Sequence, residues 1–250
     1  MKTKICLLTI IFAVAACFVS LSFAGEYEDG IEAFLGRDYE TAYKLFFKEA
    51  EAGSARAQYK IGYMYENGDG VSRKYDTAAK WYRLAAEQGH EPAMFNLAEM
   101  YADGRGVNQD DKEAFRLFRT AAEKGHMPSM YNLAIIYSEG RGVAIDEKES
   151  VKWFTKAAQK GFAPAQYNLG LIYADGLGVL QNEKEAFRWF SLAAAQGHAA
   201  SKCCLAEMYA TGLGISKDLS KAKQLAREGF DSGEELCRFV LAKHNLAPVK

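Results

Sequence analysis

Residues 162–197 read FAPAQYNLGLIYADGLGVLQNEKEAFRWFSLAAAQG, and this stretch decides the fold because the chain repeats its pattern every 36 residues. The clearest landmark is a Gly-x-Gly pair, which recurs at positions 68/70, 104/106, 140/142, 176/178 and 212/214. Self-similarity at a fixed period of about 20–50 residues is typical of repeat architectures. The sequence therefore predicts five full repeats, over residues 54–89, 90–125, 126–161, 162–197 and 198–233.

Each repeat has the apolar spacing of two helices that flank the glycine loop. Before the loop, Ala93, Leu97, Ala98 and Tyr101 stand at i, i+4, i+5 and i+8, which is one stripe on an α-helix. A short acceptor suited to an N-cap precedes the second helix, at Asp110, Asp146, Asn182 and Asp218, and a glutamate follows three residues later in the first three. We therefore expect an all-α fold, an α-solenoid of antiparallel helix pairs, in which each pair buries its stripe against the next repeat.

The two ends of the chain depart from the repeat. Residues 25–53 read as a shortened helix pair that caps the stack, and residues 234–250 read as a terminal capping helix with a tail. Residues 1–24 carry two lysines and then an uncharged run that ends in Ser-Phe-Ala, the pattern of a secretory signal cleaved after Ala24. The alternatives are a membrane anchor and a lipoprotein signal that would make Cys17 the acylated first residue. After cleavage we expect no integral membrane span and a periplasmic or secreted protein.

Composition and motifs argue against several classes of function. The chain has 31 Lys and Arg against 32 Asp and Glu, for a net charge of −1, which predicts no nucleic-acid partner because such proteins carry a basic patch. The Gly-x-Gly pairs lie between helices and lack the strand of a dinucleotide site, so we expect no cofactor. His90, His126 and His198 share one register position at least a repeat apart, too far for a common metal ion. We predict no metal site, no catalytic residues and structural roles for these histidines.

The first helices carry a candidate binding surface. If the stripe that contains Leu97 packs against neighbouring helices, the residues two positions before and after it turn toward the open face, beside a row of asparagines. This selects a predicted groove set of Tyr59, Tyr63, Phe95, Asn96, Glu99, Tyr131, Asn132, Ile135, Tyr167, Asn168 and Leu171, and the series continues at Glu207. Aromatic and amide groups in a row suit a peptide partner. The alternative is that the aromatic rings pack between repeats as core.

Three cysteines remain after the signal: Cys203, Cys204 and Cys237. The odd number leaves at least one thiol free or paired between molecules. Because the terminal helix should stack beside repeat five, a disulfide from Cys203 or Cys204 to Cys237 is one interpretation. The other is that the cysteines are small buried apolar side chains.

The pattern Ala-x-x-x-Leu-Gly-x-x-Tyr-x-x-Gly-x-Gly-Val at 165–179, followed by Lys-x-Ala-x-x-Trp-x-x-x-Ala-Ala-x-x-Gly at 184–197, is very similar to the Sel-1-like repeat, a relative of the tetratricopeptide repeat. The resemblance covers residues 54–233. It implies a solenoid whose first helices line a concave groove. It also implies an adaptor function, because members of the family generally bind other proteins or peptides and the bacterial members are often exported.

The resulting prediction is an exported, non-enzymatic scaffold of the bacterial envelope that binds a protein or peptide along its groove. One alternative is a β-lactam-binding or weakly hydrolytic envelope protein, since a cysteine-rich branch of the family is associated with that activity. This chain lacks the paired cysteines of that branch in repeats one to four. A third hypothesis is a redox-active protein that uses Cys203 or Cys204 with Cys237.

Overall fold

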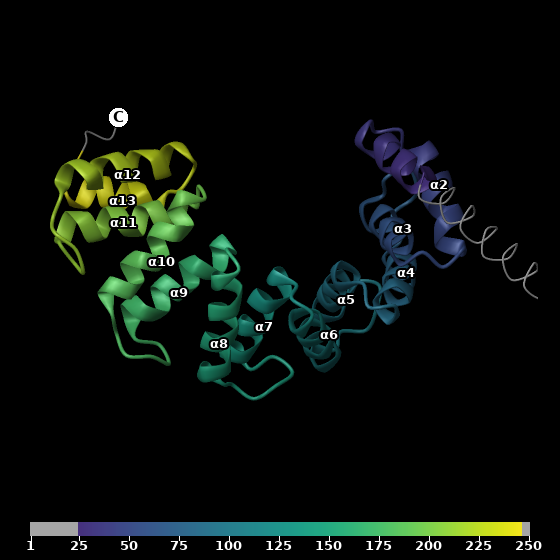
Figure 1. Cartoon of the computed structure of the whole chain (residues 1–250), viewed down its shortest axis with the longest axis horizontal. Helices are drawn as coiled ribbons and strands as arrows, with labels where there is room; N and C mark the ends of the chain where they lie inside the picture. Colours follow the sequence, from purple (N-terminus) through teal and green to yellow (C-terminus); the bar gives the residue numbers. More distant parts are fainter. Residues whose placement is uncertain (1–24, 247–250) are drawn as a thin grey trace, which may run out of the picture. The chain divides into compact units, whose positions relative to one another are not determined.

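The computed structural model describes residues 25–246, and within that range the chain forms helices and no strand (Figure 1). The expected fold class, an α-solenoid of repeating helix pairs, is confirmed. A first helical segment covers residues 25–35. The helices that follow are α2 (Tyr39–Glu51), α3 (Ala55–Asn67), α4 (Tyr75–Glu87), α5 (Glu91–Asp103), α6 (Asp111–Glu123), α7 (Met127–Glu139), α8 (Glu147–Gln159), α9 (Ala163–Asp175), α10 (Glu183–Ala195), α11 (Ala199–Thr211), α12 (Leu219–Asp231) and α13 (Leu236–Lys243). The predicted signal, residues 1–24, lies outside the described residues.

The chain divides between Leu117 and Phe118 into two compact units, here called unit 1 and unit 2. In unit 1, α3 packs against α2 and α4, and α4 packs against α5. In unit 2, each helix from α7 to α11 packs against the next, and α13 packs against both α11 and α12. Figure 1 shows α11, α12 and α13 side by side. Contacts between neighbours along the chain are what a stack of helix hairpins requires.

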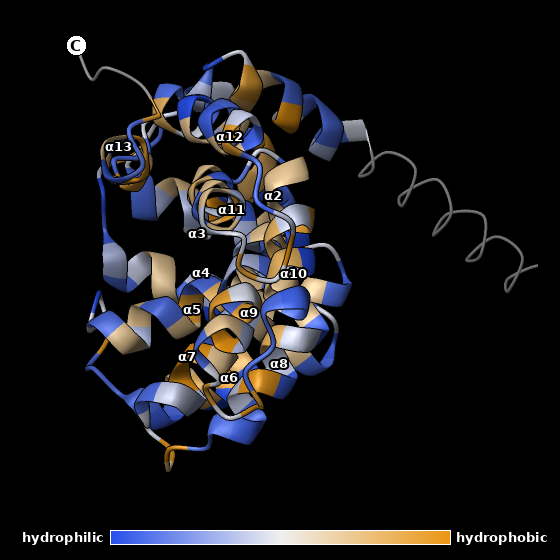
Figure 2. Cartoon of the chain, turned by 90° about the vertical axis from the view of Figure 1, so that its left-hand side faces the viewer, coloured by the Kyte–Doolittle hydropathy of each residue, from blue (hydrophilic) through white to orange (hydrophobic). Residues whose placement is uncertain are grey.

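Small residues let the helices of a pair approach closely. A Cβ atom at Gly62 would lie 2.7 Å from the ring of Tyr82, and one at Gly170 would lie 2.6 Å from the ring of Phe190. The same register position holds Ala98, which is fully buried. Most helices in Figure 2 carry both hydrophobic and hydrophilic residues, as amphipathic helices do. The recurrence of small residues at this position of each repeat is therefore a packing requirement of the helix pair.

The predicted N-caps of the second helices are confirmed. In each, the side chain accepts a hydrogen bond from the backbone N–H three residues on: Asp110 from Glu113 (3.0 Å), Asp146 from Glu149 (3.0 Å), Asn182 from Glu185 (3.1 Å) and Asp218 from Lys221 (2.9 Å). The glutamates do not show the reciprocal bond that we expected. They instead form ion pairs one turn onward, Glu113 with Arg116, Glu149 with Lys152 and Glu185 with Arg188.

The three histidines of the shared register position are N-caps of first helices. Their Nδ1 atoms accept from backbone N–H groups, His90 from Ala93 (3.2 Å), His126 from Ser129 (3.3 Å) and His198 from Ser201 (3.3 Å). Only an unprotonated Nδ1 can accept such a bond. Burial lowers the pKa of His198, against the opposing charge of Glu234, which favours the neutral ring that the cap needs.

The two glycines of each Gly-x-Gly loop have different structural roles. The first, such as Gly104, ends a first helix with a left-handed φ of 69°. The second, such as Gly106, also has a positive φ, of 70°. It packs against the start of the second helix of the preceding repeat, where an added Cβ would meet the backbone of Tyr75. Gly178 and Gly214 approach Glu147 and Glu183 in the same way. These loops thus connect one repeat to the one before it.

Candidate functional site

Two of the pockets in unit 2, of about 380 Å³ each, occupy equivalent places one repeat apart. The inner pocket lies among α7, α8 and α9, and the terminal pocket lies among α9, α10, α11 and α13. Residues that line the two pockets stand 36 positions apart, as in the pairs Ile135/Leu171, Ser138/Ala174, Glu147/Glu183, Phe154/Phe190, Asn168/Cys204 and Leu177/Leu213. Leu171 lines both pockets, so they adjoin along α9. We take this pair of pockets as the candidate functional site.

The structure brings part of the predicted groove set to these pockets. Ile135, Asn168 and Leu171 line them. Tyr131 and Tyr167 instead pack between repeats. The ring of Tyr131 lies 5.7 Å from that of Phe162, and the ring of Tyr167 lies 4.9 Å from that of His198. Both tyrosines therefore contribute to the contact between repeats, as the alternative interpretation had it.

The members in unit 1, and the remaining asparagine, are also mostly covered. The ring of Tyr59 lies 5.8 Å from that of Tyr82 and 4.9 Å from that of His90. Tyr63 is the most open, with 36% of its surface exposed. The rest are half-buried: Phe95, Asn96, Glu99 and Asn132. Burial raises the pKa of Glu99, although nearby Arg105 opposes the shift. A peptide-binding role for the full set stays a prediction.

Sequence reasoning missed the walls that the second helices and loops contribute. Glu147 and Phe154 come from α8, Glu183 and Phe190 come from α10, and Leu177 comes from a Gly-x-Gly loop. The predicted groove set contains residues of the first helices alone. The same 36-residue register that identified the groove set also contains these residues, so a search of every repeat position for matched apolar and acidic residues could have found them.

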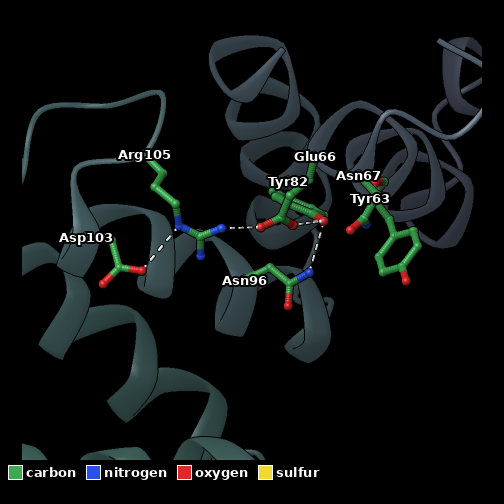
Figure 3. Close-up of polar contacts among 7 residues, drawn as sticks. All are labelled: Tyr63, Glu66, Asn67, Tyr82, Asn96, Asp103 and Arg105. Atoms are coloured by element: carbon green, nitrogen blue, oxygen red, sulfur yellow. Dashed lines mark hydrogen bonds and ion pairs between the residues drawn. The ribbon is translucent and has the colours of Figure 1, made fainter. Parts of the chain in front are cut away.

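In unit 1, a polar network occupies the place that corresponds to the inner pocket, two repeats earlier (Figure 3). Arg105 stands where Leu177 stands in unit 2, and its guanidinium pairs with the carboxylate of Glu66 at 2.8 Å and with that of Asp103 at 3.2 Å. Glu66 accepts a hydrogen bond from the Tyr82 hydroxyl at 2.7 Å, and Asn96 donates to that hydroxyl at 2.9 Å. Burial, together with the charge of Glu66, raises the pKa of Tyr82. The same repeat position is thus a polar network in unit 1 and apolar pockets in unit 2.

A disulfide joins Cys203 of α11 to Cys237 of α13, with a Cα–Cα distance of 4.8 Å. Of the two pairings that the sequence allowed, the structure has this one. Cys203 stands at the register position of Tyr131 and Tyr167, so a bridge replaces an aromatic ring there. Gly229 makes room for it, because a Cβ at that position would meet the Sγ of Cys237, whereas the equivalent position of the preceding repeat is Ala193.

Cys204 is a free thiol that lines the terminal pocket. Burial raises the pKa of Cys204 to about 12, and Glu234 and Glu207 add to the shift. A thiol in that range is protonated at neutral pH and is a weak nucleophile.

Contacts of Glu207 with Lys243 and His244 hold the last helix against α11 at the terminal pocket. The carboxylate of Glu207 lies 2.7 Å from Nζ of Lys243 and 2.8 Å from Nε2 of His244. Burial acts to raise the pKa of Glu207, but the hydrogen bonds from Lys243 and His244 outweigh it and the pKa is lowered. Glu207 is therefore ionised at neutral pH and committed to these two partners.

Among residues 25–246, no cluster of three or more His, Cys, Asp or Glu side chains is arranged to hold a metal ion. None of the described helices is long and apolar enough to cross a membrane.

The repeat pattern, the helix pairs and the solenoid class define a Sel1-type repeat protein. The sequence profile described as "Sel1 repeat" matches residues 15–54, 55–90, 91–126, 128–162, 163–198 and 201–234. The chain belongs to the Sel1 repeat family. The first matched segment covers the region that we expected to be a shortened cap.

Solved structures agree with this assignment. The chain is similar to a Sel1 repeat protein from Oxalobacter formigenes, with 31% identity, a TM-score of 0.79 and coverage of 87% of this chain and 86% of that one. It is also similar to c5321, described as a protective antigen of uropathogenic Escherichia coli with an SLR fold, with 38% identity, a TM-score of 0.77 and coverage of 80% of this chain. The match spans only 43% of the c5321 chain.

A Klebsiella pneumoniae protein described as a putative Sel1 repeat protein shares the fold at 23% identity and a TM-score of 0.51, over 81% of this chain and 99% of that one. A comparison with curated protein sequences gives no significant match. Nothing among these similarities indicates a β-lactam-binding function.

Proposed function

We propose that this protein is an exported, non-catalytic scaffold that binds peptide or protein segments in the inner and terminal pockets of unit 2. One observation carries the proposal: two open, largely apolar pockets occupy equivalent repeat positions and share Leu171. A polypeptide repeats its own backbone, so successive side chains can enter successive equivalent pockets. The family supports the general statement, since Sel1 repeats are typical of protein–protein interaction scaffolds.

Exposed apolar side chains around the pockets support binding over a purely structural role. Leu177 is 55% exposed, Leu213 is 50% exposed and Phe239 is 71% exposed. Contiguous apolar surface of this kind marks sites of interaction in soluble proteins. Two titratable groups of the terminal pocket argue against catalysis by them, because Cys204 is protonated at neutral pH and Glu207 is paired with Lys243.

Leu171→Asp is expected to weaken peptide binding strongly, because one substitution places a charge in the wall of both pockets. We would select twelve-residue peptides from a random display library on the purified protein and measure the enriched peptides by fluorescence anisotropy. Loss of a central apolar contact at a hot spot costs about 2 kcal/mol or more, so we expect binding to weaken by more than about tenfold.

The matched control for this experiment is Leu192→Asp, which makes the same change at an exposed leucine of α10 that does not line either pocket. This variant should bind like the wild type, and circular dichroism should show that both variants are folded. Enriched peptides that bind Leu171→Asp as tightly as the wild type would place the binding site elsewhere and refute the proposal.

Export is the second part of the proposal. It is supported by the signal pattern of residues 1–24 and by the disulfide between Cys203 and Cys237, since disulfides persist in oxidising compartments. Mass spectrometry of the protein from the envelope fraction of its host is expected to find Gly25 as the first residue. An acylated Cys17 would identify a lipoprotein instead, and a chain that retains Met1 in the cytosol would contradict export.

A further inference from the structure

Two glutamates at the inner and terminal pockets of unit 2 have carboxylates that pair with no other described side chain. Glu147 lines the inner pocket and Glu183 lines the terminal pocket, at the same register position. Within the described part of the chain, neither carboxylate takes part in a salt bridge or a side-chain hydrogen bond. By contrast, the other acids of these walls are neutralised, Glu139 by Arg141 at 2.7 Å and Glu207 by Lys243 and His244.

The Gly-x-Gly loops place each of these glutamates next to an exposed leucine at the edge of its pocket. Gly178 approaches Glu147 so closely that an added Cβ would lie 3.2 Å from the Cβ of the glutamate, and Gly214 approaches Glu183 in the same way, at 2.7 Å. The residues just before these glycines, Leu177 and Leu213, are the exposed leucines that line the pockets. Each pocket therefore presents an apolar cavity and an adjacent carboxylate, and the same arrangement recurs one 36-residue repeat later.

Folding does not require the two charges. An acidic residue in the first turn stabilises a helix, and Asp111 is also acidic at this register position. Tyr39, Tyr75 and Leu219 occupy the same position in the other repeats, and their helices form without a charge there. In α8 and α10 that first-turn role is also served by Glu149 and Glu185, which pair with cations one turn onward. The charged residues of the two pockets are four glutamates, Glu139, Glu147, Glu183 and Glu207, and one lysine, Lys243.

We propose that the partner is a basic amphipathic peptide segment, which places one apolar side chain in each pocket and a lysine or arginine beside Glu147 and beside Glu183. This inference rests on the proposed function and specifies its ligand. Complementary charge next to an apolar anchor fixes the register of the bound segment and discriminates against acidic sequences.

The test uses the random twelve-residue peptide library as the probe. Enriched peptides are expected to carry lysine or arginine close to apolar residues. Their affinity for the full-length protein carrying Glu147→Gln and Glu183→Gln should fall by about two- to thirtyfold, the range expected for the loss of two exposed ion pairs. The affinity of the wild type should weaken as NaCl is raised from 50 to 500 mM, and that of the double variant should change much less.

The matched control carries Glu149→Gln and Glu185→Gln, the same change of charge in the same helical turns but outside the pockets. This control variant should bind the enriched peptides like the wild type. A peptide whose basic residues are replaced by glutamine should bind the wild type and the Glu147→Gln/Glu183→Gln variant with equal affinity. Neutral or acidic enriched peptides that depend on Leu171 but not on Glu147 and Glu183 would overturn this inference and leave the proposed function standing. Failure to find any peptide that depends on Leu171 would overturn both.

Discussion

Replacing Cys237 by serine is expected to lower the free energy of unfolding of the C-terminal end of the protein by about 3–4 kcal/mol. The disulfide closes a loop with a sequence separation of 34, and the loss of chain entropy for a loop of that length is of this size. The loop contains all of α12 and leads into α13, so the bridge ties the last helix to α11. Urea unfolding of the two proteins, monitored by circular dichroism, measures the difference.

The loss should be concentrated in α13, because a solenoid packs each repeat only against its neighbours. Hydrogen exchange of the α13 amides is expected to accelerate in Cys237→Ser, with little change in α7 or α8. Leu236, Phe239 and Val240 would leave the wall of the terminal pocket at the same time. Peptides that bind both pockets should then bind Cys237→Ser more weakly.

Cys204→Ser is the control, since Cys204 forms no bridge. It should retain the slow exchange of α13, and the wild type in a thiol reductant should behave like Cys237→Ser. Equal stability of the wild type and Cys237→Ser under oxidising conditions would show that the bridge does not hold α13.

The second large effect is expected at Gly106. Gly106→Ala should lower the free energy of unfolding of unit 1 by about 2–5 kcal/mol, for two reasons that add. A non-glycine residue at a positive φ costs about 1–2 kcal/mol, and overpacking costs about 1–3 kcal/mol more. Overpacking arises because the new Cβ would meet the backbone of Tyr75 and Asp76, which belongs to the preceding repeat and cannot rotate away as a side chain could. Thermal and urea denaturation measure the loss.

Gly104→Ala separates the two contributions. Gly104 has a similar φ of 69°, but a Cβ there would lie 3.4 Å from the Cβ of Gln109, which is ordinary contact. We therefore expect a loss of only about 1–2 kcal/mol, from the backbone conformation alone. Equal losses in the two variants would mean that the second glycine of the loop is required for its φ and not for the approach to the preceding repeat.

Local signals in the sequence predicted most of the fold. The helix pairs, the N-caps at Asp110, Asp146, Asn182 and Asp218 and the closing glycines all depend on hydrogen bonds within a few residues. The candidate site was predicted only in part. Leu171 and Asn168 were identified, but Phe154 and Glu147 were not, because the pocket walls come from three successive helices.

The sequence by itself determined the period, the helices and their ends, since these follow from helical geometry and from capping within one repeat. Only the tertiary structure decided which contacts the side chain at a given position of the repeat makes. Arg105 reaches Glu66 in unit 1, whereas Leu177 at the same position leaves an apolar pocket in unit 2. Likewise, Cys203 and not Cys204 bridges to Cys237. Adjacent residues on a helix point about 100° apart, so only the packing of α13 against α11 determines which thiol faces it.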